Sequence, residues 1–192
     1  MIRFDEHLPS LPKRVLVAGV SGCGKTTLAR RVSDVLGIPH TEIDALFHGA
    51  NWSRRDEFED DLRELALADA WVTEWQYREA RPVLAARADL LVWLDLPFAS
   101  VTLPRVVTRT VRRRMSKEVL WNGNREAPLH TFFTNREHII RWAWSTRNKL
   151  KTLVPEAESG FSQLAVVRLR SQREVDSWLK ALDEQYGSPT MR

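Results

Sequence analysis

The sequence predicts an α/β fold in which one parallel sheet is covered by helices on both faces. Short apolar runs rich in β-branched residues alternate along the chain with runs whose apolar residues recur at helical spacing. Strands that alternate with helices form parallel sheets joined by right-handed crossovers. A chain of 192 residues suits one well-filled core better than two, so we expect residues 1–192 to form one domain.

Five strands are expected, and each is a short run of mostly apolar residues. DLLVWLDLP is the strongest of them, followed by RVLVAG, whereas HTEID, AWVTEW and QLAVVRLRS are more mixed. Strands that are buried on both faces read as nearly continuous apolar runs. In chain order the strands are expected at 14–19, 40–44, 70–75, 89–97 and 163–171.

Six helices are expected between and after these strands, because apolar residues recur there every three or four positions. Gly37 and Pro39 end the first helix, Pro82 lies near the start of the third, and Pro104 interrupts the fourth near its beginning. In chain order the helices are expected at 25–36, 54–69, 81–88, 100–115, 135–153 and 174–185.

A polar loop and the two chain ends complete the expected organisation. Asparagine, glycine and proline residues break the helical pattern over 122–128, and we expect a small mobile lid at 115–128. Residues 1–13 are expected to be a loose lead-in and residues 187–192 a frayed tail.

The composition indicates an ordinary globular protein of a reducing compartment. The chain is 43% hydrophobic and 28% charged. No run reaches the ~18 consecutive apolar residues of a membrane span, and the first residues do not resemble a secretory signal. The single cysteine, Cys23, cannot form an intramolecular disulfide. We therefore expect a cytoplasmic protein, a monomer or a homodimer, with no membrane partner.

Charge is distributed unevenly along the chain, whose net charge is +4. Acids outnumber bases over 42–74, whereas residues 105–151 contain twelve Lys or Arg and three Glu. A basic half favours an anionic partner, either nucleotide phosphates or nucleic acid. The alternative is a solvated basic face.

The stretch GVSGCGKTT at 19–27 matches the phosphate-binding pattern G-x-x-x-x-G-K-[ST] in full, between an expected strand and an expected helix. Glycines allow a tight turn whose N–H groups converge on one anion, and the helix adds its positive dipole end. Lys25 is expected to reach the β- and γ-phosphates of ATP, and the Thr26 hydroxyl to ligate Mg²⁺. The expected phosphate-binding residues are Gly19, Ser21, Gly22, Cys23, Gly24, Lys25, Thr26 and Thr27.

Cys23 has two interpretations. It is a small residue that fits the loop, or a thiol whose pKa is lowered at a helix N-terminus and which acts as a redox switch.

The rest of the chain does not fit a GTPase or a motor ATPase. A GTPase needs the pattern N-K-x-D, and here Lys151 stands in place of the Asp. Motor ATPases are usually larger and carry paired acids after a strand, whereas these strands end in the lone acids Asp44, Glu74 and Asp95. The class of protein that remains is a small phosphotransferase, which moves the γ-phosphate of ATP to a small acceptor.

Several pieces of the chain are similar to one family of small kinases. These pieces, which span most of the chain, are GVSGCGKTTLARRVSDVLGIPHTEIDAL, NW, WVTEWQY, ADLLVWLDLP, RVVTRTVRRR, GNRE and RWAWSTRNK. They resemble the adenylate-kinase-related P-loop kinases known as topology modulation proteins. The resemblance implies a three-layer P-loop NTPase fold of the nucleoside-monophosphate-kinase type, with a five-stranded parallel sheet in the order 2-3-1-4-5. It implies ATP and Mg²⁺ as cofactors and leaves the acceptor open among nucleotides, nucleosides and other small hydroxyl compounds.

Two acids are expected at the carboxyl edge of the sheet, where ligands bind in open parallel sheets. Asp44, at the end of the second expected strand, could hold or deprotonate the acceptor hydroxyl. Glu74, at the end of the third, is expected to hold an Mg²⁺-bound water.

The resemblance also implies four further site residues. Arg109 and Arg113, four apart on one helical face, are expected to contact the nucleotide and the transferring phosphoryl group. Arg125 is expected to arrive with the lid, and Ser171 to lie where related kinases present backbone to adenine.

One departure from the family pattern concerns the end of the third strand. The family usually has Asp-Gly-Asn-Tyr there, and this chain has Glu74, Trp75, Gln76 and Tyr77. Trp75 either lines or stacks on a planar acceptor, blocks the acceptor pocket, or packs in the core.

Two other functions remain as alternatives. Trp142 and Trp144 lie near Arg141 and Arg147, and tryptophans interleaved with arginines can bind nucleic acid. Because the two tryptophans are two apart on a helix, they face different directions, which weakens the hypothesis of a nucleic-acid-binding ATPase. The other alternative is a nucleotide-binding regulator without turnover.

Overall fold

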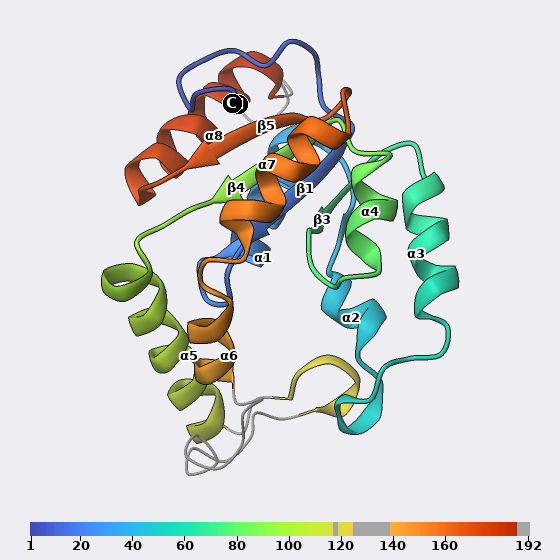
Figure 1. The fold of residues 1–192 in the computed structure, drawn as a ribbon, viewed down its shortest axis with the longest axis vertical. Helices are drawn as coiled ribbons and strands as arrows, with labels where there is room; N and C mark the ends of the chain where they lie inside the picture. Colours follow the sequence, from blue (N-terminus) through green and yellow to red (C-terminus); the bar gives the residue numbers. More distant parts are fainter. Residues whose placement is uncertain (117–118, 125–138, 188–192) are drawn as a thin grey trace.

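The computed structural model describes residues 1–116, 119–124 and 139–187. Its sheet has five parallel strands in the order β2-β3-β1-β4-β5, which confirms the expected topology (Figure 1). At the centre, Val15 of β1 is paired with Val72 of β3 on one side and with Leu90 of β4 on the other. The strands are β1 (Arg14–Gly19), β2 (His40–Thr41), β3 (Trp71–Glu74), β4 (Leu90–Leu94) and β5 (Ala165–Leu169).

Helices connect and cover the strands. The α-helices of the described ranges are α1 (Lys25–Leu36), α2 (Ile43–Phe47), α3 (Phe58–Leu67), α4 (Ala80–Ala85), α5 (Leu103–Met115), α6 (Ile139–Thr146), α7 (Leu150–Gly160) and α8 (Gln172–Tyr186). Shorter turns are the 3₁₀ turns η1 (Ala50–Trp52) and η3 (Trp121–Gly123) and the π-helical turn η2 (Phe98–Thr102). Within these ranges, every helix is too short or too polar to cross a bilayer.

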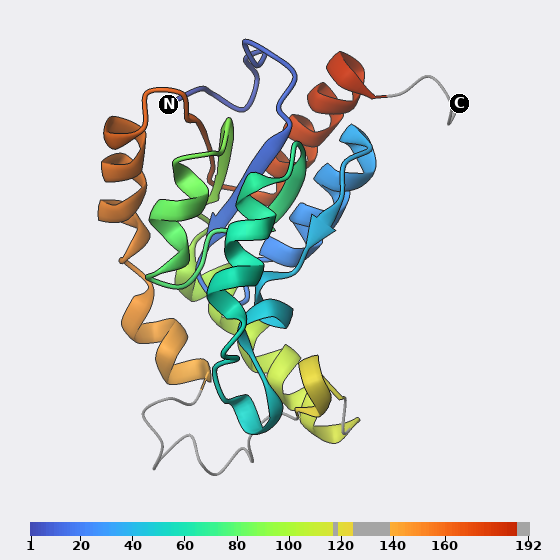
Figure 2. The same ribbon diagram turned by 90° about the vertical axis from the view of Figure 1, so that its right-hand side faces the viewer.

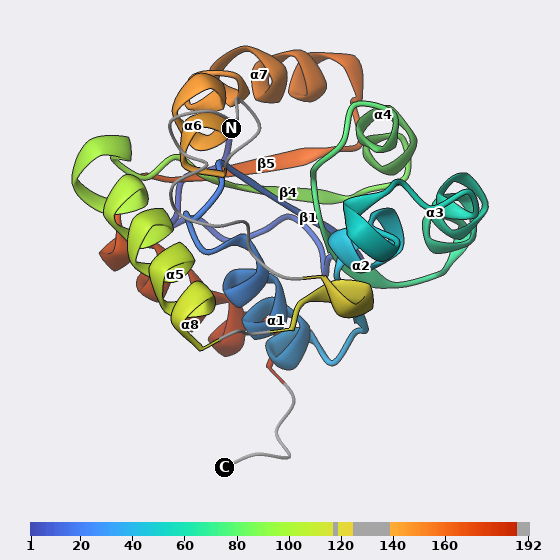
Figure 3. The same ribbon diagram turned by 90° about the horizontal axis from the view of Figure 1, so that it is seen from below.

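Two core clusters hold the layers together, one on each face of the sheet. Seen from below, α3, α4 and α7 lie over one face, and α1 and α8 lie over the other (Figure 3). Phe58, Leu84 and Val154 pack on the first face, and Leu28 and Trp178 pack on the second. Burial of such apolar side chains is the main term that stabilises the fold.

The carboxyl edge of the sheet is the edge at which ligands are expected to bind. α2, α5 and α6 lie beyond this edge (Figure 1). α5 follows β4 through η2, and Pro104 is accommodated in its first turn, where a missing N–H costs little. The edge is therefore framed by helices from both halves of the chain.

Two expected elements differ from the structure. The strand expected at 40–44 ends at Thr41, and Asp44 lies in the first turn of α2. The helix expected at 135–153 is two helices, because the chain turns at 147–149 between α6 and α7 (Figure 2). α7 then continues past Pro155 to Gly160.

The expectation of a loose lead-in at 1–13 is wrong. The N–H of Ile2 donates to the Val166 carbonyl at 2.7 Å, so the segment begins beside the outer edge of β5. Leu8 is buried, and its carbonyl accepts hydrogen bonds from Gln185 and Tyr186. Apolar residues spaced without a period anchor this segment, which is why no pattern predicted it.

Candidate functional site

The loop between β1 and α1 has the geometry of a phosphate cradle. Gly22 and Gly24 have φ of 80° and 100°, a region that favours glycine. Lys25 begins α1, is nearly buried, and its Nζ donates to the Val20 carbonyl at 3.4 Å. Thr26 and Thr27 follow in the first turn of the helix, whose free N–H groups favour an anion.

Close packing against α5 explains one of the loop glycines. A Cβ on Gly22 would lie 2.2 Å from Cγ2 of Val106 and 3.2 Å from its backbone N. α5 therefore rests directly on the loop.

The structure supports the role of Cys23 as a small residue that fits the loop. Burial raises the pKa of its thiol, and the nearby charge of Lys25 opposes this only in part. Its N–H donates to the Val20 carbonyl at 3.2 Å, inside the loop, and its Sγ would meet a Cβ on Gly19 at 2.3 Å. A buried, protonated thiol does not fit a redox switch.

Glu74 is a buried carboxylate at the end of β3, only 2% exposed. Its Oε2 accepts the Ile43 N–H at 3.1 Å, and its Oε1 lies 3.4 Å from Nε2 of His40. Burial raises the pKa of Glu74, but hydrogen bonds from His40, the Ile43 amide and the Thr26 hydroxyl together hold it below its ordinary value. Glu74 is therefore ionised at neutral pH.

The pair formed by Thr26 and Glu74 fits a magnesium ion. The Thr26 hydroxyl lies close enough to lower the pKa of Glu74. Oε1 of Glu74 is buried, with Nε2 of His40 within ion-pair distance. Oxygen donors are the ligands that Mg²⁺ prefers, usually with retained waters and phosphate oxygens. These two residues would hold it, Thr26 as a ligand and Glu74 through a bound water.

Asp44 faces the loop that follows β3. Nε2 of Gln76 donates to its Oδ1 at 2.8 Å, and the Tyr77 hydroxyl donates to the same oxygen at 2.6 Å. Oδ2 makes no hydrogen bond within the described ranges. Hydrogen bonds to Oδ1 thus hold the carboxylate in place, and Oδ2 can accept a hydrogen bond or a proton from a substrate.

Tyr77 is itself held firmly. Its ring stacks on Phe47, with centroids 3.7 Å apart and an interplanar angle of 10°, and its φ is 53°. Burial raises the pKa of Tyr77, and the charge of Asp44 raises it further, so the hydroxyl stays a neutral donor.

His48 completes this network. Its Nε2 lies 3.0 Å from the Tyr77 hydroxyl. Because that hydroxyl donates to Asp44, Nε2 carries the hydrogen in this bond. Burial lowers the pKa of His48, and Asp44 opposes this only partly, so the ring is neutral at pH 7.

Trp75 packs in the core, the third of the roles considered for it. It is 5% exposed and belongs to the cluster that includes Phe58 and Leu84. Its Nε1 donates to the Arg81 carbonyl at 3.1 Å. The ring therefore neither lines nor blocks the acceptor side of the site.

Residues 119–124, which lie within the expected lid, contact the segment 42–52. Nε1 of Trp121 donates to Glu42 at 2.9 Å. The buried amide of Asn124 donates to the Gly49 carbonyl at 2.8 Å and accepts the Trp52 N–H at 2.9 Å. Arg125, expected to arrive with the lid, lies outside the described residues.

The arginines of α5 are arranged as their spacing predicted. Arg109 and Arg113 are half-buried on the inner side of the helix, whereas Arg112 and Arg114 are exposed. The Arg113 guanidinium lies 6.0 Å from the ring centroid of Trp121. Arg113 therefore connects the loop side of α5 to the segment 119–124.

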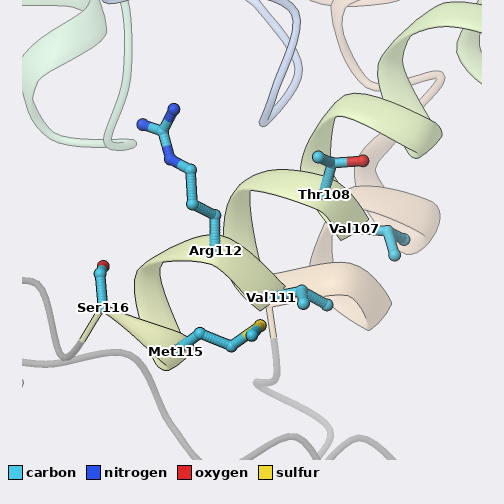
Figure 4. A pocket seen from close by; sticks show the side chains of 6 residues that line it. All are labelled: Val107, Thr108, Val111, Arg112, Met115 and Ser116. Atoms are coloured by element: carbon cyan, nitrogen blue, oxygen red, sulfur yellow. The ribbon is translucent and has the colours of Figure 1, made fainter.

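Two hollows lie along α5. One, of about 540 Å³, is lined by residues from successive turns of the helix. Among them, Val107, Val111 and Met115 point to the same side of α5 (Figure 4). The second, of about 360 Å³, includes Arg105 and Arg109. Of the two, only the second contains a residue expected to bind nucleotide.

Ser171 lies after β5 and caps α8, since its Oγ accepts the Glu174 N–H at 3.2 Å. The next residue, Gln172, accepts a hydrogen bond from Arg105 of α5 at 3.1 Å. The hydroxyl of Ser171 is thus used by the helix, and contact with adenine remains a prediction for its backbone.

Sequence reasoning missed the residues that support the two acids. His40 lies beside Glu74 and Gln76 beside Asp44, and the sequence assigned neither of them a role. A signal was available for Gln76, because polar residues directly after a buried strand lie at the ligand edge.

Comparisons with known proteins found partial matches in sequence and matches in fold. No family model matches the chain. Cytidylate kinase of Nitratidesulfovibrio vulgaris (strain DP4) is 46% identical over 61 residues, which cover 32% of this chain and 26% of that protein. The chain thus spans about a quarter of this relative.

Solved structures match over most of the chain. The gluconokinase from Sinorhizobium meliloti 1021 has a TM-score of 0.51 and 20% identity, covering 92% of this chain and 94% of the other. The shikimate kinase from Acinetobacter baumannii has a TM-score of 0.50 and 19% identity, covering 94% and 96%. Together with the observed strand order and phosphate loop, they show that the chain has the P-loop kinase fold.

Proposed function

We propose that this protein is an Mg²⁺-dependent phosphotransferase that moves the γ-phosphoryl group of ATP to a hydroxyl group of a small acceptor. The observation that carries the proposal is the position of the Asp44 carboxylate. It lies at the carboxyl edge of the sheet, the same edge as the phosphate loop, and hydrogen bonds from Gln76 and Tyr77 to its Oδ1 hold it there. A nucleotide-binding regulator has no need of a second, prepared carboxylate there.

Each group has a defined part in this reaction. Lys25 and the half-buried Arg109 and Arg113 place positive charge around the phosphates, which is the main catalytic requirement of phosphoryl transfer. The bond between the γ-phosphorus and the bridging oxygen breaks, and a bond forms to the acceptor oxygen. The proton of the acceptor hydroxyl passes to Oδ2 of Asp44, and ADP leaves.

Thr26 and Glu74 would hold Mg²⁺. When bound, the ion would neutralise charge on the β- and γ-phosphate oxygens. The lid role of Arg125 and the backbone contact of Ser171 with adenine belong to the same proposal.

The names of the matched proteins support a small-molecule acceptor, since cytidylate kinase, gluconokinase and shikimate kinase are each named for one. The test is release of ADP from ATP and Mg²⁺ across nucleotides, nucleosides, sugars and hydroxy acids. We expect one acceptor class to raise ADP release well above background hydrolysis. If every acceptor is silent while DNA or RNA stimulates hydrolysis, the protein is a nucleic-acid-dependent ATPase instead.

A variant test accompanies the panel. Lys25→Ala should abolish turnover while leaving the denaturation profile close to that of the wild type. Preserved turnover in this variant would contradict the role of the loop.

A further inference from the structure

One member of the hydrogen-bond network around Asp44, the side chain of His48, has no part in the reaction as proposed. Its Nε2 lies 3.0 Å from the Tyr77 hydroxyl, and that hydroxyl donates to Oδ1 of Asp44 at 2.6 Å. His48 also directly follows α2, where its backbone N–H donates to the Asp44 carbonyl at 3.0 Å. The imidazole is therefore one hydrogen bond away from the group that holds the proposed base.

The Tyr77 hydroxyl has a single hydrogen, and both Asp44 and His48 are close enough to accept it. A neutral imidazole carries its hydrogen on one of its two nitrogens, so Nε2 of His48 is either a donor to the hydroxyl or a rival acceptor. As a donor, Nε2–H directs the hydroxyl hydrogen to Asp44 and strengthens that bond by polarising the O–H group. As an acceptor, it would draw the hydrogen away from the carboxylate.

Three aromatic rings confine the imidazole of His48. The rings of Phe47 and Trp52 meet it edge to face, with centroid distances of 5.1 and 5.0 Å and interplanar angles of 87° and 85°. The ring of Trp121 lies more nearly parallel to it, at 6.4 Å and 30°. A side chain enclosed in this way keeps one orientation, as precise positioning of a site requires.

The backbone around this network is strained. A residue other than glycine with φ in the left-handed region costs free energy, and such residues cluster at functional sites. The amide of Asn122 donates to the His48 carbonyl, which ties one such residue to the histidine. Within the described ranges, positive φ at residues other than glycine occurs at Asn51, Trp52, Tyr77 and Asn122, all on the segments that surround His48.

We propose that His48 is a positioning residue for the proposed base: its Nε2–H fixes the Tyr77 hydroxyl as a donor to Asp44, and the surrounding aromatic rings keep the imidazole in the orientation that this requires. The inference rests on the proposed function. It gives His48 no contact with ATP or with the acceptor, so that loss of its ring should affect kcat and not the binding of either substrate.

The first experiment determines the tautomer of His48 and needs no turnover. Two-bond ¹H–¹⁵N correlation spectra at about pH 8, where an ordinary histidine is neutral, show which ring nitrogen carries the hydrogen, and His48→Gln assigns the signals. The hydrogen should be on Nε2. Tyr77→Phe removes the partner of Nε2–H and should shift its resonances.

Tyr186→Phe is the matched control for this experiment, because it removes a hydroxyl that bonds to the Leu8 carbonyl instead. It should leave the resonances of His48 unchanged. A hydrogen on Nδ1 of His48, or resonances that shift equally in Tyr77→Phe and Tyr186→Phe, overturns the proposal.

The second experiment measures kcat and KM with the identified acceptor. His48→Leu should lower kcat by about threefold to tenfold, the effect of losing one hydrogen bond, with KM for ATP and acceptor close to the wild-type values. His48→Gln supplies an amide N–H in place of Nε2–H and should restore most of kcat. Because His48 acts through Tyr77, the double variant His48→Leu/Tyr77→Phe should lose no more than Tyr77→Phe alone.

The exposed His7→Leu is the control for the kinetics and should keep the kcat of the wild type. Losses that multiply in the double variant, or an equal kcat in His48→Leu and His7→Leu, overturn the role of His48 and leave the proposed kinase function standing. If the Nε2–H tautomer responds to Tyr77→Phe but no acceptor is phosphorylated, the positioning of Asp44 stands and the kinase function is what fails.

Discussion

At the scale of single residues, the site depends on a carboxylate whose two oxygens differ. Oδ1 of Asp44 accepts hydrogen bonds from Gln76 and Tyr77, both neutral donors. These two hydrogen bonds fix the rotamer of the carboxylate, so that Oδ2 has one direction in which to accept. Preorganised polar groups of this kind are what phosphoryl transfer requires.

Asp44→Asn keeps both hydrogen bonds to the side-chain oxygen but removes the proton acceptor. We expect kcat with the identified acceptor to fall by ~10²–10⁴, with unchanged affinity for ATP measured by calorimetry. Tyr77→Phe removes one hydrogen bond to a charged group and should cost about tenfold in kcat. The exposed Asp56→Asn is the control, and an equal loss in Asp44→Asn and Asp56→Asn would mean that Asp44 acts only through net charge.

His48 predicts how stability depends on pH. Burial holds the pKa of His48 below its ordinary value of 6.5, so the folded protein binds its proton less readily than the unfolded chain. The resulting stability is complete above pH 6.5 and is lost as pH falls from 6.5 towards the folded pKa. Urea denaturation of the wild type should therefore show falling stability over this window.

The control for that measurement is the exposed His7. His48→Gln should flatten the pH dependence below pH 6.5, whereas His7→Gln should not. The interpretation fails if His48→Gln and the wild type lose stability equally with pH.

At the scale of elements, the nucleotide side of the site is assembled by contact between a loop and a helix. Gly22 allows α5 to touch the phosphate loop through Val106. The position of Arg109 and Arg113 relative to Lys25 follows from this contact. Segment 119–124 plays the corresponding part on the acceptor side, because Asn124 fixes it to Gly49 and Trp52.

Gly22→Ala tests the loop–helix contact. The positive φ costs a non-glycine residue about 1–2 kcal/mol, and the new Cβ forces Val106 and α5 away. We expect ATP affinity to fall together with stability. Gly160→Ala is the control, because a Cβ there meets no atom within 4 Å. Unchanged ATP binding in Gly22→Ala would show that α5 does not set the geometry of the loop.

At the scale of the whole molecule, the amino-terminal segment is part of the fold. Ile2 pairs with β5, and Leu8 packs in the cluster under α1 and α8. Segments from both ends of the chain thus meet on the face of the sheet that carries α1, the helix that follows the phosphate loop.

Leu8→Ala measures this contribution. Leu8 is 6% exposed and Leu11 is 49% exposed, so the two leucines form a matched pair. Leu8→Ala should lower the free energy of unfolding by about 2–4 kcal/mol, and Leu11→Ala should change it by less than about 0.5 kcal/mol. Equal effects of the two substitutions in denaturant titrations would show that the segment is the loose lead-in that the sequence suggested.

Most of the framework could be predicted from the sequence because it rests on local signals. Apolar runs located β1 and β4, and the glycine pattern before Lys25 located the phosphate loop. The strand order, which the family resemblance implied, is also confirmed.

The acceptor side could not be predicted in the same way, because its contacts join distant residues. Asp44 lies on a helix of five residues rather than at a strand end, and Asn124 reaches Gly49 across 75 positions. Trp75 packs in the core, and no local pattern in the sequence could predict which of its three possible roles it has.

The pairing of Ile2 with Val167 also affects how separate molecules meet. Unpaired strand margins are where one polypeptide adds to another in fibril growth. Here one margin is partly occupied by the molecule's own first residues, and the opposite margin is a strand of two residues. Concentrated solutions should accordingly resist aggregation by strand addition.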